Sequence, residues 1–170
     1  MIKVIKIAVS ATSLLVSSLA VADGYWSNWL TNNHNGLERS IVRIQNSKVT
    51  QLQGREQPGY GIINLRLIGG TEIYPELTAW ATTNQRGYIR SVSLNPSEIA
   101  TGLAVKSQWG YGVVDARLLS NTNDSTWLTN NPDAETEDAE ECAPGYYLTA
   151  IQVNEQAGYG VVDVRFYCGN

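Results

Sequence analysis

The sequence GYGVVDVR at positions 158–165 occurs earlier in two related versions, GYGVVDAR at 110–117 and GYGIINLR at 59–66. The three tyrosines, Tyr60, Tyr111 and Tyr159, are 51 and 48 residues apart. A second set of matching segments places a tryptophan 31 or 32 residues before each tyrosine: SNWLTNN (27–33), TAWATTN (78–84) and STWLTNN (125–131). Two sets of anchors at matching separations establish an internal triplication, and such a period constrains the fold.

The sequence of each repeat predicts short β-strands. LTAIQV (148–153) alternates apolar and polar residues, and GVVDVRFY (160–167) is rich in β-branched and aromatic residues. ERSIVRI (38–44) and IRSVSL (89–94) predict a further strand in the first two repeats. The third repeat has the acidic stretch PDAETEDAEECAPG (132–145) at this place, where we expect the strand to be replaced or displaced.

A β unit of about 50 residues cannot bury its own apolar face, so three such units are expected to pack around a common axis. We predict an all-β fold, a three-fold pseudo-symmetric β-prism with one sheet per repeat; a β-trefoil is the alternative. The prism is expected to be a single domain over 23–170, with repeats at about 24–72, 73–122 and 123–170.

The first 22 residues have the features of a secretory signal peptide. Lys3 and Lys6 precede an apolar run, which ends in small residues up to Ala22 and is too short for a membrane anchor. We expect cleavage after Ala22 and a secreted or periplasmic protein without a membrane span. The remaining chain has 10 basic and 16 acidic residues, a formal charge of −6, which argues against nucleic acid and anionic membranes as partners.

The two cysteines, Cys142 and Cys168, both lie in the third repeat. In an exported chain such a pair predicts a disulfide. No metal or cofactor is expected, because the single histidine, His34, is distant in sequence. The acidic run at 133–141 lacks the residue order of a calcium loop, so we expect a solvated, mobile loop, with calcium binding as the alternative.

The third repeat, CAPGYYLTAIQVNEQAGYGVVDVRFYC (142–168), resembles a repeat of the vitelline membrane outer layer protein I family. Those repeats have Cys, Pro and Gly, an alternating strand of the type GFxLxVE, and then QGxGDDTALNGIRLxC. The openings GYWSNW at Gly24 and STW at Ser125 are similar to the family's GxWGxW starts. The resemblance implies bracketing cysteines at Cys142 and Cys168, inward residues Ile151 and Val153, a QG turn at Gln156 and Gly158, and the last-strand arginine at Arg165.

Two features depart from the family pattern: GDDTALNG is shortened to GYGVVD, and the first two repeats lack cysteines. The resemblance implies a β-prism of three Greek-key sheets, a fold also found in jacalin-like lectins and in the middle domain of insecticidal crystal toxins. It implies less about activity, because one fold hosts many functions. Members of the family are linked to egg-coat structure and to chemistry on chito-oligosaccharides.

An acid or amide precedes an arginine by two residues in every repeat: Asn64/Arg66, Asp115/Arg117 and Asp163/Arg165. Residues two apart on a strand share a face. The pairs are therefore interpreted either as a polar ring that binds a sugar or as a structural network near the axis, in which each arginine contacts a neighbouring repeat. The structural interpretation is favoured, because all three repeats carry the pair.

The GYG turns require positive φ or close backbone approach around each tyrosine, which either stacks on a sugar or caps the core. Trp29, Trp80 and Trp127 recur in register, which favours core packing. Trp109 has no counterpart in the other repeats and is a candidate for exposed contact. The candidate ligand-binding residues are Trp109, Tyr60, Tyr111, Tyr159, Gln57, Gln108, Gln156, Asp115 and Asp163.

No motif for a catalytic nucleophile or metal is present. Glycoside hydrolysis by paired carboxylates remains an alternative, with Asp115 and Asp163 as the first pair to consider. The leading hypothesis is a secreted, non-enzymatic, lectin-like module, with a glycan or an extracellular protein as its partner. The alternatives are a structural or interaction protein of an extracellular coat, matrix or toxin assembly, and a carbohydrate-active enzyme acting on chito-oligosaccharides.

Overall fold

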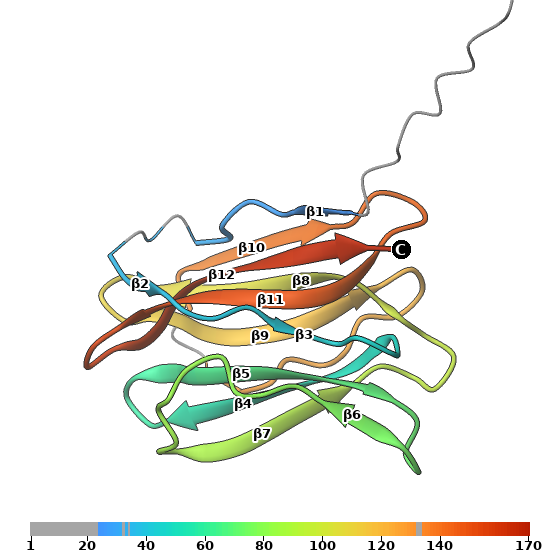
Figure 1. Cartoon of the computed structure of the whole chain (residues 1–170). Helices are drawn as coiled ribbons and strands as arrows, with labels where there is room; N and C mark the ends of the chain where they lie inside the picture. Colours follow the sequence, from blue (N-terminus) through green and yellow to red (C-terminus); the bar gives the residue numbers. More distant parts are fainter. Residues whose placement is uncertain (1–23, 32, 34, 132–133) are drawn as a thin grey trace, which may run out of the picture.

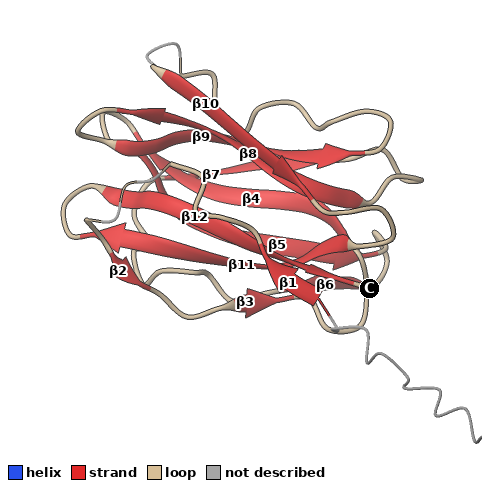
Figure 2. Ribbon diagram, turned by 90° about the horizontal axis from the view of Figure 1, so that it is seen from above, coloured by secondary structure: helices blue, strands red, loops and turns tan. Residues whose placement is uncertain are grey.

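The computed structural model describes residues 24–31, 33, 35–131 and 134–170, so the signal peptide predicted at 1–22 lies outside the described residues. Within these ranges the regular secondary structure consists of twelve β-strands, which form three sheets around one core (Figures 1 and 2). No described segment forms a helix of the length and apolarity needed to cross a membrane. Three sheets around an axis confirm the expected β-prism and exclude the trefoil.

One sheet is a four-stranded Greek key built on the first GYG hairpin. The hairpin strands are β4 (Val49–Gln57) and β5 (Gly61–Gly70). They are flanked by β6 (Pro75–Leu77) next to β5 and by β7 (Tyr88–Ser93) next to β4. The spatial order is therefore β6-β5-β4-β7, the lower layer of Figure 1.

The second sheet contains the second hairpin, β8 (Ala100–Gln108) and β9 (Gly112–Ser120), and a strand from the acidic stretch, β10 (Thr136–Glu141). β10 runs antiparallel to β8, from the pair Thr136↔Ser107 to the pair Glu141↔Gly102. The expectation of a loop at this place is wrong. A strand needs only backbone partners, and the edge position of β10 leaves two of its four carboxylates exposed to water and the other two half-buried.

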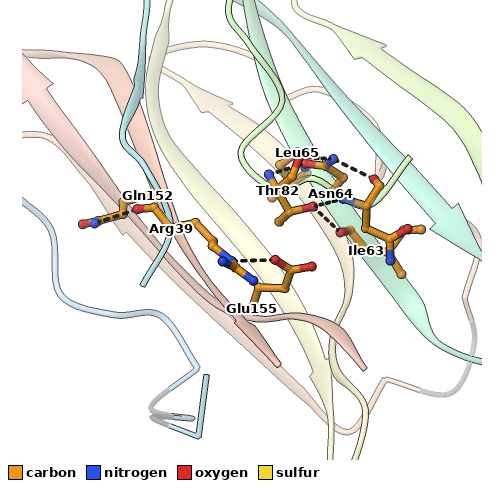
Figure 3. Close-up of polar contacts among 8 residues, drawn as sticks. Arg39, Ile63, Asn64, Leu65, Thr82, Gln152 and Glu155 are labelled. Carbon is orange, nitrogen blue, oxygen red and sulfur yellow. Dashed lines mark hydrogen bonds and ion pairs between the residues drawn. The ribbon is translucent and has the colours of Figure 1, made fainter. Parts of the chain in front are cut away.

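The third sheet is formed by both ends of the described chain. The last hairpin, β11 (Tyr147–Gln156) and β12 (Gly160–Gly169), pairs with β1 (Gly24–Trp26), β2 (Leu37–Glu38) and β3 (Val42–Arg43). Arg39 Nε pairs with Glu155 Oε2 at 2.6 Å, and its carbonyl oxygen accepts from Gln152 Nε2 at 3.0 Å (Figure 3). These contacts attach the early segment to the last hairpin.

The sheets and the sequence repeats are offset. Each sheet combines the hairpin of one repeat with the tryptophan segment and first strand of the following repeat. For the last hairpin, the first repeat takes this part, through the segment at 24–43. The expectation of one sheet per repeat is therefore corrected to one sheet per pair of consecutive repeats. This exchange of strands binds each repeat to the next.

The three sheets enclose one apolar core, to which every hairpin contributes fully buried side chains. Ile151 and Val153, the inward residues implied by the family resemblance, are both fully buried. The predicted disulfide is confirmed: Cys142 follows β10 in one sheet and bonds to Cys168 in β12 of another. This bond crosslinks two sheets at the edge strand formed by the acidic stretch.

Candidate functional site

The three hairpins that carry the GYG sequence end in the same turn. In the second hairpin the N–H of Tyr111 donates to the carbonyl oxygen of Gln108 at 3.0 Å, and Gly110 between them has a φ of 83°. A positive φ at this position is typical of a type II turn and favours glycine. The other two turns repeat the hydrogen bond, from Tyr60 to Gln57 and from Tyr159 to Gln156.

The second glycine of each turn contacts the neighbouring hairpin. A Cβ on Gly112 would lie 2.6 Å from the Cα of Val162 and 2.7 Å from the carbonyl oxygen of Val161. Gly61 is in the same close contact with residues 113–114, and Gly160 with residues 62–63. The contacts run from the first repeat to the second, from the second to the third, and from the third to the first. They gather the three turns, called here the GYG end, at one end of the prism (left in Figure 1).

The acid or amide that follows each turn fixes a TNN or TTN loop, whose segment runs beside the second strand of the hairpin. Asp115 Oδ1 accepts hydrogen bonds from the backbone of Thr129 at 2.7 Å and of Ala116 at 2.9 Å. Asp163 Oδ1 accepts from Thr31 N at 2.8 Å in the same way. Both residues are buried where they bond these loops.

The first repeat has an amide at this place. Asn64 Oδ1 accepts from Thr82 N at 2.8 Å, while its Nδ2 donates to the carbonyl oxygens of Thr82 and Asn84 at 2.9 and 2.8 Å (Figure 3). The structural interpretation of the trio is therefore supported over that of a sugar-binding polar ring, since these side chains face loop backbone.

The arginines two residues later stack on the recurring tryptophans. Arg66 lies 4.5 Å from the ring centroid of Trp80, with equivalent stacking of Arg117 on Trp127 and of Arg165 on Trp29. Arg66 also donates two hydrogen bonds to Gln53 of its own hairpin.

Two expectations about this cluster are corrected. Each arginine does contact a neighbouring repeat, through the tryptophan on which it stacks, but within its own sheet instead of near the axis. The tryptophans are half-buried outside the core. Side chains alternate along an extended segment, so it is the next residue in each case, Leu30, Ala81 or Leu128, that enters the core.

Burial raises the pKa of Asp115 above its ordinary value, and the N–H groups of Thr129 and Ala116 offset part of this effect. Ionised Asp115 therefore costs stability above its folded-state pKa, and the cost falls as the pH drops through that value. We expect Asp115→Asn to stabilise the protein at pH 7 by about 1 kcal/mol, because the same place in the first repeat accommodates Asn64 with both donors bonded.

Urea denaturation at pH 7 and pH 4 would measure this gain, which should shrink in acid. The matched reverse change, Asn64→Asp, should cost about 2 kcal/mol at pH 7, because it removes the donors that bond the carbonyl groups of Thr82 and Asn84. A loss of stability in Asp115→Asn at pH 7 would show that the carboxylate is required in its charged form.

Three clefts open between neighbouring repeats at the GYG end. Cleft 1 has a volume of about 760 Å³ and is lined by Gly59, Glu56, Arg90, Tyr111, Asn130 and Asn131 among others. Cleft 2, of about 550 Å³, is lined by Asn33, Asn35, Trp109, Tyr111, Glu135 and Tyr159 among others. Cleft 3, of about 360 Å³, is lined by Gln57, Tyr60, Asn84, Arg86 and Tyr159 among others.

The clefts contain most of the predicted ligand-binding residues. Tyr60, Tyr111 and Tyr159 are 42%, 40% and 42% exposed, and Trp109 is 89% exposed. The glutamines Gln57, Gln108 and Gln156 each line at least one cleft and are half-buried. Asp115 and Asp163 are 1% and 0% exposed and line none of the three. The three tyrosine rings therefore face water instead of capping the core, and their stacking on a sugar stays a prediction.

Sequence reasoning missed the polar residues of the loops beside the turns. Asn33, Asn84 and Asn131 line one cleft each, because the Asp or Asn of the hairpin fixes their loops beside a GYG turn. The recurrence of these asparagines in the TNN and TTN segments is the sequence feature that could have identified them as site residues. Glu135 was considered only as part of the acidic run, as a loop or a calcium site, and its place in cleft 2 was not predicted. Within the described residues, no cluster of three acidic, histidine or cysteine side chains is suited to hold a metal.

No family model and no curated protein sequence matches the chain. Solved structures do match. Calsepa lectin in complex with a bisected glycan has a TM-score of 0.64 at 14% identity, over 86% of this chain and 98% of the lectin. A mannose-binding jacalin-related lectin from Ananas comosus has a TM-score of 0.60 at 13% identity, over 87% and 99% of the two chains.

Single-chain recombinant jacalin has a TM-score of 0.63 at 11% identity, over 90% of this chain and 99% of jacalin. Identities this low carry information about fold only, and the resemblance to the vitelline membrane outer layer protein I family stays a prediction. The arrangement of the sheets and these matches together assign the chain the β-prism fold of the jacalin-related lectins.

Proposed function

We propose that this protein is an exported, non-enzymatic carbohydrate-binding module whose ligand site lies at the GYG end. The observation that carries the proposal is the set of three clefts there, each combining an exposed tyrosine with amide side chains of a neighbouring loop. Aromatic rings stack on the apolar faces of sugars, and a few convergent amides bond their hydroxyl groups. The solved structures of the same fold include lectins described as binding mannose or complexed with a glycan.

Cleft 2 is the strongest candidate of the three. Trp109 and Tyr111 come from the second hairpin and Tyr159 from the third, so aromatic rings of two repeats line one hollow. The amides of Asn33, Asn35 and Gln156 complete a lining suited to a monosaccharide unit of a glycan.

Calorimetric titration of glycans selected from an array tests the proposal. We expect Trp109→Ala to weaken binding roughly tenfold, because an exposed ring that stacks on a sugar contributes about 1.4 kcal/mol. Tyr111→Ala and Tyr159→Ala should weaken it severalfold.

Tyr74→Ala is the matched control, because Tyr74 is 81% exposed and lies far from cleft 2. It follows β5, at the end of the first hairpin that is opposite its GYG turn. Its binding should equal that of the unchanged protein. Failure to bind any glycan, or equal losses in the Trp109 and Tyr74 variants, would contradict the proposal.

The second candidate function is a structural or interaction protein of an extracellular assembly. The observation in its favour is a group of exposed apolar side chains near β6, with Ile73 at 79% and Tyr74 at 81% exposure. Sedimentation measurements that find stable self-association, abolished by Tyr74→Ala and without glycan binding, would favour it. An enzymatic role for Asp115 and Asp163 is disfavoured, because both carboxylates bond loop backbone beneath a covering segment.

A further inference from the structure

The three clefts at the GYG end share a backbone arrangement and differ in charge. In cleft 1 the lining residues Glu56 and Arg90 form an ion pair, with Nε–Oε2 at 2.7 Å. Cleft 3 has Arg86 among its lining residues. Cleft 2 has Glu135, the one charged residue among the described residues that line it. Cleft 2 is therefore the acidic cleft of the three.

Glu135 is held in a defined position beside the exposed indole of Trp109. Its N–H donates to the carbonyl oxygen of Ser107 at 2.9 Å, and its Oε2 accepts the backbone N–H of Trp109, also at 2.9 Å. The next residue, Thr136, bonds through Oγ1 to Ser107 Oγ at 2.6 Å and begins β10. The pairing of β10 with β8 thus fixes the carboxylate next to the backbone of the residue that carries the indole.

This combination suits a cation. A carboxylate attracts an ammonium group, and the faces of indole and phenol rings attract one as well. Trp109, Tyr111 and Tyr159 supply three such rings around the cleft that contains Glu135. The other two turns have Pro58 and Ala157 at the position of Trp109, so the indole ring is particular to the second turn. The indole of Trp109 and the carboxylate of Glu135 therefore distinguish cleft 2 from the other two clefts.

We propose that cleft 2 selects a sugar with a free, protonated amino group, such as a glucosamine unit in a deacetylated chitin-type oligomer. This inference rests on the proposed carbohydrate-binding function. The ring of Trp109 stacks on the apolar face of the pyranose, while the carboxylate of Glu135 pairs with the ammonium group. The amides of Asn33, Asn35 and Gln156 are available for the hydroxyl groups.

The test is calorimetric titration of the mature protein with three tetrasaccharides of the same β-1,4 linkage: glucosamine, N-acetylglucosamine and glucose oligomers. We expect the glucosamine oligomer to bind five- to tenfold more tightly than the other two, the effect of a charge-assisted hydrogen bond at a partly exposed site. Glu135→Gln should abolish this preference by lowering the affinity for the glucosamine oligomer to that for the glucose oligomer, while Gln can still accept the N–H of Trp109.

Glu137→Gln is the matched control. It removes the same charge one residue into β10, where Glu137 bonds to Arg117 at 3.3 Å, and it should retain the full preference. Equal loss in the two variants would overturn the proposal, because it would trace the preference to overall charge. Binding of Nα-acetyl-lysine amide as tightly as the glucosamine oligomer would overturn the assignment to a sugar. Glycan binding at the GYG end without preference for the amine would overturn this inference alone, whereas no glycan binding would overturn the proposed function as well.

Discussion

Gly112→Ala is expected to destabilise the protein by about 4 kcal/mol and to lower its melting temperature by roughly 10 to 15 °C. The φ of Gly112 is 85°, which costs a residue with a Cβ about 1 to 2 kcal/mol. The new Cβ would also lie 2.6 Å from the Cα of Val162 in the next hairpin, and overpacking of a rigid site costs a further 1 to 3 kcal/mol or more. Thermal and urea denaturation would measure both effects together.

Gly110→Ala separates the two causes. Gly110 has nearly the same φ, 83°, but a Cβ built on it meets no atom within 4 Å. This variant should lose only about 1 to 2 kcal/mol, from the backbone conformation alone. Equal losses in the two variants would mean that close contact between neighbouring hairpins contributes nothing to the stability of the prism.

Removal of the disulfide is expected to cost about 3.5 kcal/mol, the loop-closure entropy for Cys142 and Cys168 at a sequence separation of 26. Cys142→Ala/Cys168→Ala should therefore melt about 10 °C below the unchanged protein. The unchanged protein, fully reduced before it is heated, serves as the control and should melt at the temperature of the double variant. A fall of less than 2 °C in both would show that the edge strand β10 is held by its pairing alone.

The hairpins could be predicted from sequence because alternation of apolar and polar residues has the period of a half-buried strand, as in residues 148–153. β10 was missed because charged residues suggest a loop, although an edge strand tolerates charge where water reaches its side chains. The offset of sheets and repeats could not be read from the repeats. An alignment of three copies gives no information on whether Trp80 packs on its own hairpin or on the preceding one.

The candidate site was predictable in part. Trp109 was singled out because it breaks the repeat pattern, and its exposure agrees with that argument. Asp115 and Asp163 were included as candidates, since sequence does not reveal the loops that cover them. Glu135 could not be identified, because its position beside Trp109 depends on the pairing of two strands from different repeats.

The pairing of β1 with β12 affects how this protein folds. Gly24 meets Gly169, so the third sheet needs backbone from both ends of the described chain. Contacts between residues so distant in sequence are entropically costly to close and are typical of slow-folding topologies. A growing chain can form its first hairpins early, but β1, β2 and β3 have no partners until β11 and β12 have been synthesised. The native prism is therefore the product of a late, cooperative step that requires almost the whole chain.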